Sequence, residues 1–330
     1  MSAVDDLALL NDWQRGFPLE AEPFARIAQA HGLPAAGVLA RYRAWAADGT
    51  LSRVGGVFAA GAGGAGLLAA MAVPRERLEA VAAIVSAHPG VNHNYEREHA
   101  WNLWFVVGAA DAAAAARVLD ELETATGCAT LRLPMRRAYR IDLGFDLRGA
   151  LAASPTGTRG EAPAPLARSD WPLAALAERG LPLVERPYDA WAGTLGTAPE
   201  EVTATLERWL ADGTLKRFGA VVRHHELGFA ANAMAVFDVP DDAVDACGER
   251  LARESAVTLA YRRERARGWP YNLFCMLHGR DRESVRQALE GVRRRSGLAA
   301  AGHDVLFSRR RFKQTGPRRF APPEEFRHAA

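Results

Sequence analysis

The sequence is poor in cysteine and carries almost no net charge. Its 330 residues include only three cysteines, Cys128, Cys247 and Cys275, with no CxxC spacing. Neither a disulfide framework nor a cysteine-rich zinc or iron–sulfur site is therefore expected. The formal net charge of +2 is too small to require a polyanionic partner, although arginines cluster in residues 308–320. The composition permits nucleic acid as a partner but does not imply it.

Signals for secretion and membrane insertion are also missing. The first ten residues, MSAVDDLALL, hold an acidic pair where a signal peptide is basic. Residues 54–74 form an uncharged stretch as long as a membrane span, but their many glycines make a poor bilayer helix. We therefore expect a cytoplasmic protein with no membrane partner. With 49% hydrophobic and 24% charged residues, the chain can bury the cores of two or more domains.

What the sequence does contain is a second version of its own pattern. The matching pairs are GFPLEAEPF (16–24) with GLPLVERPY (180–188), ADGTLSRVGGV (47–57) with ADGTLKRFGAV (211–221), NYERE (94–98) with AYRRE (260–264), and WNLWF (101–105) with YNLFC (271–275). Self-similarity at a nearly constant offset indicates a tandem duplication. Residues 147–170 between the copies are rich in Ala, Pro, Gly and Ser, which is typical of a linker.

Each copy divides into a helical part and a part that alternates strands and helices. The helical part shows a short helix, a turn and a longer amphipathic helix that ends at Asp-Gly. This pattern predicts a helix-turn-helix followed by a two-stranded wing, with RFGAVV (217–222) as a wing strand. The second part predicts the order β-α-β-β-α-β, a ferredoxin-like unit.

The predicted fold class is therefore α+β, a tandem duplication of a winged helix-turn-helix domain plus a ferredoxin-like domain. The expected boundaries are winged helix-turn-helix domains at residues 1–60 and 171–225, ferredoxin-like domains at residues 66–146 and 229–316, a linker at residues 147–170 and a basic tail at residues 317–330.

The two copies differ where each leaves its helical part. The second copy reads VVRHHELGFAANAM (221–234), whereas the matching stretch VFAAGAGGAGLLAAM (57–71) has no histidine or arginine. Its GAGGAG (61–66) fits the GxGxxG dinucleotide pattern, but no parallel βαβ unit surrounds it, so a nucleotide site is not expected. The histidines show no metal-binding spacing such as HExxH, so we expect no metal held by the protein alone.

A winged helix joined to a ferredoxin-like domain resembles the Lrp/AsnC family of transcriptional regulators. The strings RFGAVVRHHELGFAANAM (217–234), WPYNLFCMLHG (269–279) and NYEREHAWNLWF (94–105) are more similar to the siroheme decarboxylase subunits of the haem d1 and alternative haem pathways. In that family two related subunits pair, and here they are fused. Only one of two pseudo-symmetric clefts then needs to be active, and GAGGAG is interpreted as the eroded one.

The resemblance implies that carbon dioxide is removed from two acetate side chains of siroheme, giving 12,18-didecarboxysiroheme. No cofactor is expected, because the macrocycle accepts the electrons and its iron belongs to the substrate. His224, with His99 from the other copy, is the expected general acid, since imidazole titrates near neutral pH. Axial ligation of the siroheme iron by His224 or His225 is the alternative.

The remaining candidates bind the substrate. By alternation Tyr95, Arg97 and His99 share one strand face, and Tyr261 shares a face with Arg263. Guanidinium groups suit acetate and propionate groups, and aromatic rings suit the macrocycle; the alternatives are solvated arginines and aromatic residues packed in the core. The complete substrate-binding set is Arg223, His225, Arg217, Arg97, Tyr95, Tyr261, Arg263, Trp269, Tyr271 and Asn272, with His93 and His278 as weaker candidates.

The alternative function is a DNA-binding regulator of the Lrp/AsnC type. Its recognition helices would be AAGVLARYRAWAA (35–47) and PEEVTATLERWLA (199–211). The first is largely alanine and the second opens with two glutamates, which repel phosphate. DNA is thus the less favoured partner; the expected partners are siroheme and a second copy of the chain or homologous decarboxylase subunits.

Overall fold

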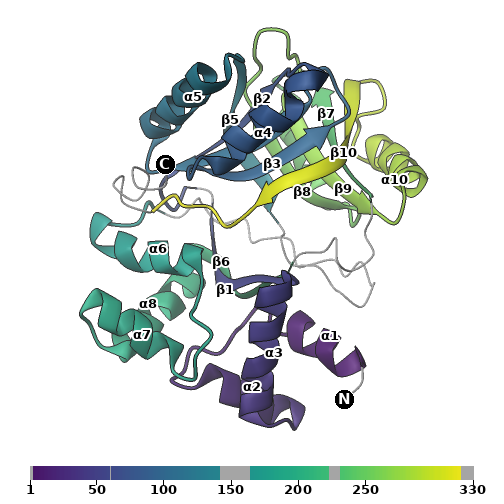
Figure 1. The fold of residues 1–330 in the computed structure, drawn as a ribbon. Helices are drawn as coiled ribbons and strands as arrows, with labels where there is room; N and C mark the ends of the chain where they lie inside the picture. The colour runs from purple at the N-terminus through teal and green to yellow at the C-terminus, as the bar shows by residue number, and fades with distance from the viewer. Residues whose placement is uncertain (1–2, 60, 142–163, 223–230, 321–330) are drawn as a thin grey trace. The chain divides into compact units, whose positions relative to one another are not determined.

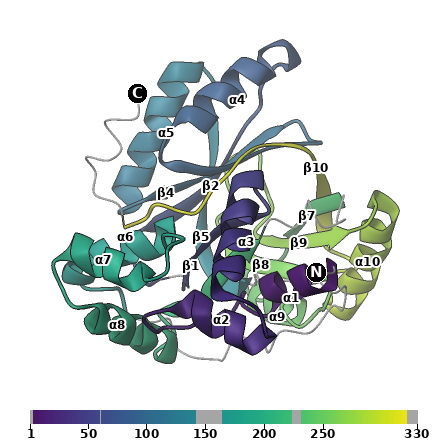
Figure 2. The ribbon, with the colours of Figure 1, turned by 60° about the horizontal axis from the view of Figure 1, so that its bottom comes forward.

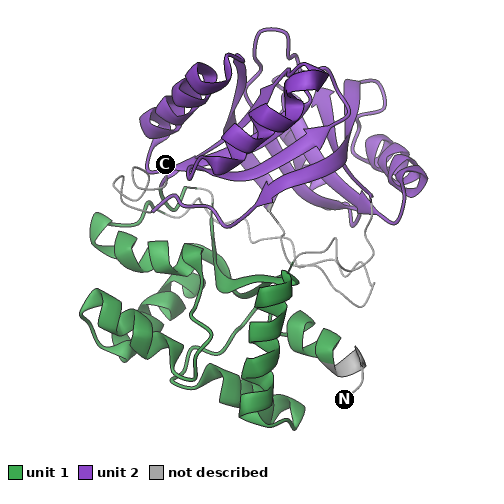
Figure 3. Cartoon of the chain, in the orientation of Figure 1, with its two compact units in different colours: residues 1–63, 144–150, 160–227 green, residues 64–143, 151–159, 228–330 purple. Residues whose placement is uncertain are grey.

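The computed structural model describes residues 3–59, 61–141, 164–222 and 231–320 (Figure 1). The chain forms two compact units, and each unit combines parts of both sequence copies (Figure 3). Unit 1 comprises residues 1–63, 144–150 and 160–227, and unit 2 comprises residues 64–143, 151–159 and 228–330. Unit 1 thus gathers the two helical parts, and unit 2 gathers the two parts that alternate strands and helices.

Unit 1 contains the same series of elements twice. The first copy supplies α1 (Ala3–Asn11), α2 (Pro23–His31), α3 (Ala35–Asp48) and β1 (Leu51–Phe58); the second supplies η2 (Arg168–Asp170), α6 (Trp171–Arg179), α7 (Pro187–Leu195), α8 (Pro199–Ala211) and β6 (Leu215–Val222). Helices α2 and α7 both begin with proline, which suits the first turn of a helix. Both end at a left-handed glycine, Gly32 (φ 64°) and Gly196 (φ 68°).

The predicted two-stranded wing in each copy is wrong. Among the described residues each copy contributes one strand, and β1 pairs antiparallel with β6 of the other copy, with Gly55 opposite Gly219. The backbone groups of a lone strand need a partner, and the equivalent strand of the other copy supplies it. A Cβ on Gly55 would lie 2.6 Å from the Ala177 oxygen, and one on Gly219 would lie 2.5 Å from the Trp13 oxygen. Glycine at both positions therefore lets neighbouring backbone approach this ribbon.

Unit 2 contains two β-α-β-β-α-β series. The first consists of β2 (Ala65–Met71), η1 (Arg75–Arg77), α4 (Leu78–Ala87), β3 (Val91–Arg97), β4 (Leu103–Ala109), α5 (Ala112–Thr126) and β5 (Thr130–Ile141); the second consists of β7 (Ala231–Asp238), α9 (Val244–Leu251), β8 (Val257–Arg263), β9 (Leu273–Gly279), α10 (Arg282–Arg295) and β10 (Gly302–Gln314). This is the element order predicted from the sequence.

The eight strands of unit 2 close into one barrel with the order β10-β3-β4-β2-β5-β8-β9-β7 (Figure 2). The last strand of each copy first pairs with its own sheet and then with the other copy's sheet. Thus Val305 of β10 lies opposite Ala235 of β7, while Arg311 lies opposite Tyr95 of β3; β5 likewise passes from β2 to β8. We call the two junctions between copies the β3–β10 seam and the β5–β8 seam.

Three clusters of buried apolar residues lie on the outer and inner faces of this barrel. Helices α4 and α5 cover the outer face of the first sheet, where Phe105 is buried, and α9 and α10 cover the outer face of the second, where Phe237 is buried. A third cluster joins inner-facing residues of both sheets, including Trp104, Met234 and Phe274. Side chains on alternate strand positions therefore point into the barrel. None of the described helices is long and apolar enough to cross a membrane.

Candidate active site

Strand β3 turns His93, Tyr95 and Arg97 to the inner face of the barrel. The intervening Asn94 points outward, because its amide donates to the Ala82 oxygen of α4 at 3.2 Å. The rings of His93 and Tyr95 stack with centroids 6.3 Å apart, and the Arg97 guanidinium carbon lies 5.7 Å from the Tyr95 ring centroid. The face sharing predicted for Tyr95 and Arg97 is therefore observed, whereas His99, predicted on the same strand face, lies beyond the end of β3.

Strand β8 of the second copy repeats part of this arrangement at the other seam. Tyr261 and Arg263 occupy the positions equivalent to Tyr95 and Arg97, and the Arg263 guanidinium carbon lies 4.6 Å from the Tyr261 centroid. Tyr261 also stacks on Phe274, with a centroid distance of 5.9 Å. Both seams thus contain a tyrosine–arginine pair.

The two inner arginines tie the copies together. Arg97 Nη1 donates to the Leu306 oxygen of β10 at 3.0 Å, and Arg263 Nη1 donates to the Leu133 oxygen of β5 at 2.7 Å. Both side chains are buried. Burial disfavours their charged forms: it lowers the pKa of Arg97 to about 10 and also lowers the pKa of Arg263. Arg97 consequently remains a cation at neutral pH, inside the barrel.

His99 follows β3 and contacts the second copy. Its Nδ1 accepts the Trp101 N–H at 2.9 Å, and its Nε2 lies 3.3 Å from the Asp304 carboxylate of β10. Because Nδ1 is an acceptor, the proton of the neutral ring sits on Nε2 and points at Asp304. The side chain is 21% exposed. The structure thus places His99 at the β3–β10 seam, with both ring nitrogens engaged.

Trp269 joins the aromatic residues of this region. Its ring lies 5.4 Å from His99, 5.1 Å from Trp104 and 5.0 Å from Tyr271, measured between centroids. Trp269 belongs to the residues that make the β8–β9 connection longer than the β3–β4 connection. It is only 1% exposed, so its faces pack against protein rings. Its indole nitrogen has no hydrogen-bond partner among the described residues.

Tyr271 lies at the edge of the same group and is partly exposed. Burial is the main cause that raises the pKa of its phenol, and the negative charges of Asp304 and Asp238 add to the effect. The phenol is therefore protonated at neutral pH and is able to donate a hydrogen bond.

Three residues predicted to bind substrate instead pack against, or hydrogen-bond to, other parts of the protein. The Asn272 amide accepts the Val239 N–H at 3.0 Å and donates to the Val239 oxygen at 2.9 Å, and the equivalent Asn102 does the same to Val73. Arg217, buried in unit 1, donates to backbone oxygens of Gln14 and Ala220. Buried polar groups need such partners. The structure therefore supports a packing role for Trp269 and a backbone-bracing role for Asn272 and Arg217.

The segment that distinguishes the copies most clearly in sequence, with Arg223, His224 and His225, lies outside the described residues. Its counterpart is described except for residue 60. Gly61, Gly63 and Gly64 there adopt positive φ angles of 96°, 138° and 67°, and the chain then enters the antiparallel strand β2. The GAGGAG stretch is thus a turn before an antiparallel strand, which is not the setting of a dinucleotide-binding loop.

Sequence reasoning missed the polar residues on the inner faces of β7 and β10. Asp304, Ser308 and Asn232 were not singled out, and His278 was only a weak candidate. The signal was present in the internal alignment. The equivalent residues of the first copy are Leu131 for Asp304, Met135 for Ser308, Gly66 for Asn232 and Gly108 for His278.

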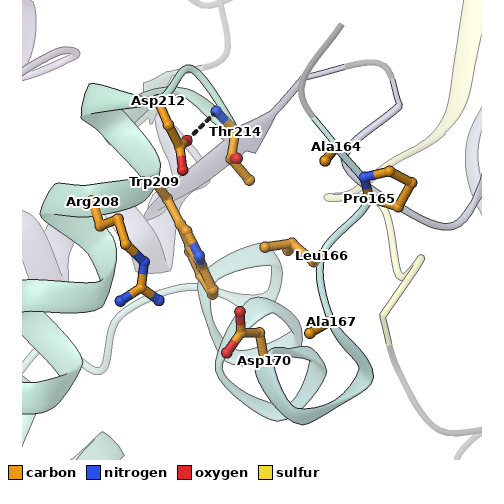
Figure 4. A pocket seen from close by; sticks show the side chains of 9 residues that line it. All are labelled: Ala164, Pro165, Leu166, Ala167, Asp170, Arg208, Trp209, Asp212 and Thr214. Carbon is orange, nitrogen blue, oxygen red and sulfur yellow. Dashed lines mark hydrogen bonds between the residues drawn. The ribbon is translucent and has the colours of Figure 1, made fainter.

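A separate cavity of about 330 Å³ lies in unit 1 (Figure 4). It is formed by residues 164–170 and the end of α8, where Trp209 and Arg208 face it and Asp212 accepts the Thr214 N–H at 2.9 Å. It contains no residue predicted for the substrate site. Within the described ranges, no three histidine, cysteine or acidic side chains are grouped so that they would hold a metal ion.

Comparison with protein families first defines the class of this chain. Residues 62–140 and 226–313 match the AsnC-like ligand binding domain, and residues 6–51 and 173–215 match the siroheme decarboxylase NirDL-like HTH domain. Each copy therefore combines a helix-turn-helix part with an AsnC-like ligand-binding part.

Individual relatives narrow this class to one family. The chain is 42% identical to the siroheme decarboxylase NirDL subunit of Paracoccus pantotrophus over 94% of this chain and 96% of that protein. It is 49% identical to the siroheme decarboxylase NirL subunit of Stutzerimonas stutzeri, over 46% of this chain and 89% of that subunit. The crystal structure of NirDL in complex with an iron-uroporphyrin III analogue superimposes with a TM-score of 0.65 and 29% identity, covering 98% of this chain and 95% of that one. The chain belongs to the siroheme decarboxylase NirDL family.

Proposed function

We propose that this chain acts on siroheme, removing carbon dioxide from two acetate side chains to give 12,18-didecarboxysiroheme. It is a siroheme decarboxylase, a carboxy-lyase. The observation that carries this conclusion is the similarity along both copies to relatives with that name. The geometry of the β3–β10 seam supports it, because a buried cation, phenols and an imidazole there suit a planar substrate with many carboxylates.

The chemistry needs no oxidant or reductant. In each step the bond between an acetate methylene carbon and its carboxylate breaks, carbon dioxide leaves, and the bonding electron pair enters the conjugated macrocycle. The resulting carbon then takes up one proton and becomes a methyl group. Two steps release two molecules of carbon dioxide and consume two protons. We therefore assign no cofactor to the protein, and the siroheme iron belongs to the substrate.

The residues of the chain supply binding, orientation and protons. We assign His224 as the general acid, with axial ligation of the iron by His224 or His225 as the alternative. Arg223, Arg97 and Arg263 hold carboxylates that do not react, which fixes the acetate that is presented. Both ring nitrogens of His99 are engaged, so His99 donates a proton only after its contact with Asp304 opens. The ring faces of Tyr95 and Tyr261 and the phenol of Tyr271 complete the wall against the macrocycle.

The finer statements follow from this assignment. We place the reaction in haem d1 or alternative haem biosynthesis, in the cytoplasm, and we interpret the two β-α-β-β-α-β series as ferredoxin-like units. Association with homologous subunits is supported by the half-length NirL and NirH subunits among the relatives, and association with a second copy of this chain is the alternative. A role as a DNA-binding regulator is less well supported, because α8 begins with Glu200 and Glu201.

The decisive experiment is anaerobic incubation of the purified chain with siroheme. We expect the product mass to fall by two carbon dioxide units, with a shifted Soret band on mixing and about one macrocycle bound per chain. Unchanged siroheme, together with tight binding of operator-like duplex DNA, would refute the decarboxylase and favour the regulator. The matched negative control is the His224→Ala chain under the same conditions.

A further inference from the structure

Three polar side chains from adjacent strands of the second copy meet inside the barrel. Asn232 at the start of β7 lies directly opposite His278 at the end of β9. Both share a strand face with inner-core residues, because Met234 and Met276 lie two positions away. Ser308 of β10 shares the inner face with Leu306, and its hydroxyl donates to Asn232 Oδ1 at 2.6 Å. We call Asn232, His278 and Ser308 the polar row.

A buried cation lies next to the polar row. Ser308 is the Cα partner of Arg97 across the seam, and Arg97 contacts the Leu306 oxygen and the Met276 sulfur, the latter at 3.9 Å. Neither of these described partners is a carboxylate. A buried guanidinium without a carboxylate partner favours an anion beside it. The electrostatics of this part of the barrel therefore match an acidic ligand group.

The first copy builds the same sheet without these polar groups. Gly66 lies opposite Gly108, as Asn232 lies opposite His278, and Met135 takes the place of Ser308. A Cβ added to Gly66 meets nothing within 4 Å, so the first copy has open space there. Since the fold forms with glycine and methionine at these positions, folding alone does not account for asparagine, histidine and serine in the second copy.

We propose that the polar row is a subsite for one ionised carboxylate of the tetrapyrrole, a carboxylate that does not react. The Asn232 amide and the His278 imidazole are neutral donors that a carboxylate accepts from, and bonds to an ionised group are the stronger kind. The Ser308 hydroxyl, which donates to Asn232 Oδ1, orients the Asn232 amide. Anchoring one acid group here sets the rotational position of the macrocycle, and thereby which acetate groups are presented for decarboxylation. The subsite rests on the proposed function. It adds to the substrate-binding residues Asn232 and Ser308, which were not predicted from the sequence, and His278, which was a weak candidate.

The test compares single variants of the polar row with a matched variant of the first copy. His278→Phe keeps the ring volume but removes the donor, and Ser308→Ala removes the hydroxyl. The control is Met135→Ala, at the position equivalent to Ser308. Affinity for siroheme is measured anaerobically from the Soret band, and unfolding temperatures verify that each variant is folded. Losing a hydrogen bond to a charged group weakens binding about ten- to a hundredfold.

We expect this loss for His278→Phe, a smaller loss for Ser308→Ala, which leaves the Asn232 amide without its orienting hydrogen bond, a partial recovery for His278→Gln, which keeps a donor, and no change for Met135→Ala. A misplaced substrate also predicts products with one acid group removed or with the wrong acid group removed, visible by mass and chromatography. Variants that bind and convert siroheme like the unaltered chain overturn the subsite while leaving the decarboxylase intact. An unaltered chain that does not bind siroheme overturns the proposed function itself.

Discussion

The two seams of the barrel are built from equivalent strands but carry different chemistry. Each contains an inner tyrosine–arginine pair, Tyr95 with Arg97 and Tyr261 with Arg263. The two seams differ at four equivalent positions among the described residues: the β3–β10 seam has Asp304, Ser308, His93 and His99, where the β5–β8 seam has Leu131, Met135, Leu259 and Arg265. Features shared by both seams follow from the common fold, whereas features of one seam indicate a function that the other seam lacks.

Arg265, at the position equivalent to His99, illustrates the difference. It donates to the Asp238 and Asp241 carboxylates at 2.8 and 2.7 Å and to the Val239 oxygen at 2.7 Å. These bonds tie the longer β8–β9 connection to the end of β7. His99 instead reaches across the seam to the other copy. The same hairpin position thus serves packing within one copy and contact between copies in the other.

The strongest test of this comparison is to separate the copies. Residues 1–152 and residues 168–330, expressed alone, each leave the strand edges of both seams unpaired. We expect each half to be nearly inactive and activity to return on mixing, measured as decarboxylated product. A second half that converts siroheme at the rate of the whole chain would show that the β3–β10 seam is not needed.

The next largest effect is expected at the loop of the second copy. His224→Ala should lower turnover about 10²–10⁴-fold, the contribution of a general acid. The matched control in the first copy is Gly66→Ala, whose added methyl meets nothing within 4 Å and should leave turnover unchanged. Steady-state rates with siroheme give the comparison. Equal, large losses in both variants would mean that both clefts are active.

Substitution of Trp269, which lies in the longer β8–β9 connection of the second copy, tests what this difference between the copies contributes to protein stability. Trp269→Ala removes a fully buried ring that contacts Trp104 and Tyr271, so the free energy of unfolding should fall by about 3–5 kcal/mol. Trp269→Phe, which keeps most of the packing, should cost clearly less. Denaturant unfolding measures both values. A loss below about 1 kcal/mol for the alanine variant would show that the ring is not a packing element.

Substitutions of the two buried arginines distinguish an effect on protein stability from an effect on siroheme binding. Arg97→Gln and Arg263→Gln each weaken a hydrogen bond from a charged group to a carbonyl of the other copy, so each should cost about 1.5–3 kcal/mol of unfolding free energy. Both variants should also bind siroheme more weakly than their stability losses explain, and the Arg97 variant should lose more affinity, because only its seam carries the polar row. Equal losses of affinity would show that the polar row adds nothing to binding.

The smallest effect concerns the outer surface of the β3–β10 seam. Hydrogen bonds from Arg282, and then from Arg309, hold the pKa of Glu98 below its usual range. Its stabilising contribution is therefore present above the ordinary glutamate pKa of about 4.3 and is lost as the pH falls through the lower, folded value. Glu98→Gln should cost about 1 kcal/mol or less at neutral pH and should flatten the loss of stability in acid.

Asp245 supplies the comparison at the other seam. Its pKa is lowered by a hydrogen bond from Tyr139 and by Arg137 and Arg262, so Asp245→Asn should also flatten the acid limb of the stability curve. Thermal unfolding at a series of pH values measures both variants. An acid limb that is as steep in the Glu98 variant as in the unaltered chain would show that its ion pairs add nothing to the seam.

The sequence alone was sufficient to predict the duplication and the order of helices and strands within each copy. Internal alignment revealed the duplication, and apolar periodicity revealed the element order, which the structure contains. Alternation correctly placed Tyr95 with Arg97 and Tyr261 with Arg263, because strand geometry assigns faces from spacing alone. The family also followed from sequence, since its motifs are long strings of neighbouring residues.

Only the tertiary structure determined which strands and side chains each strand face contacts. A spacing rule states which side chains share a face but not which strand lies opposite, because pairing between residues far apart depends on the whole fold. The wing strand of each copy therefore paired with the other copy, and β10 brought Asp304 to His99. Three polar or aromatic residues that resembled ligand contacts in the sequence are instead buried within the protein: Trp269, Asn272 and Arg217. In such surroundings each polar group must find a partner or remain unpaired.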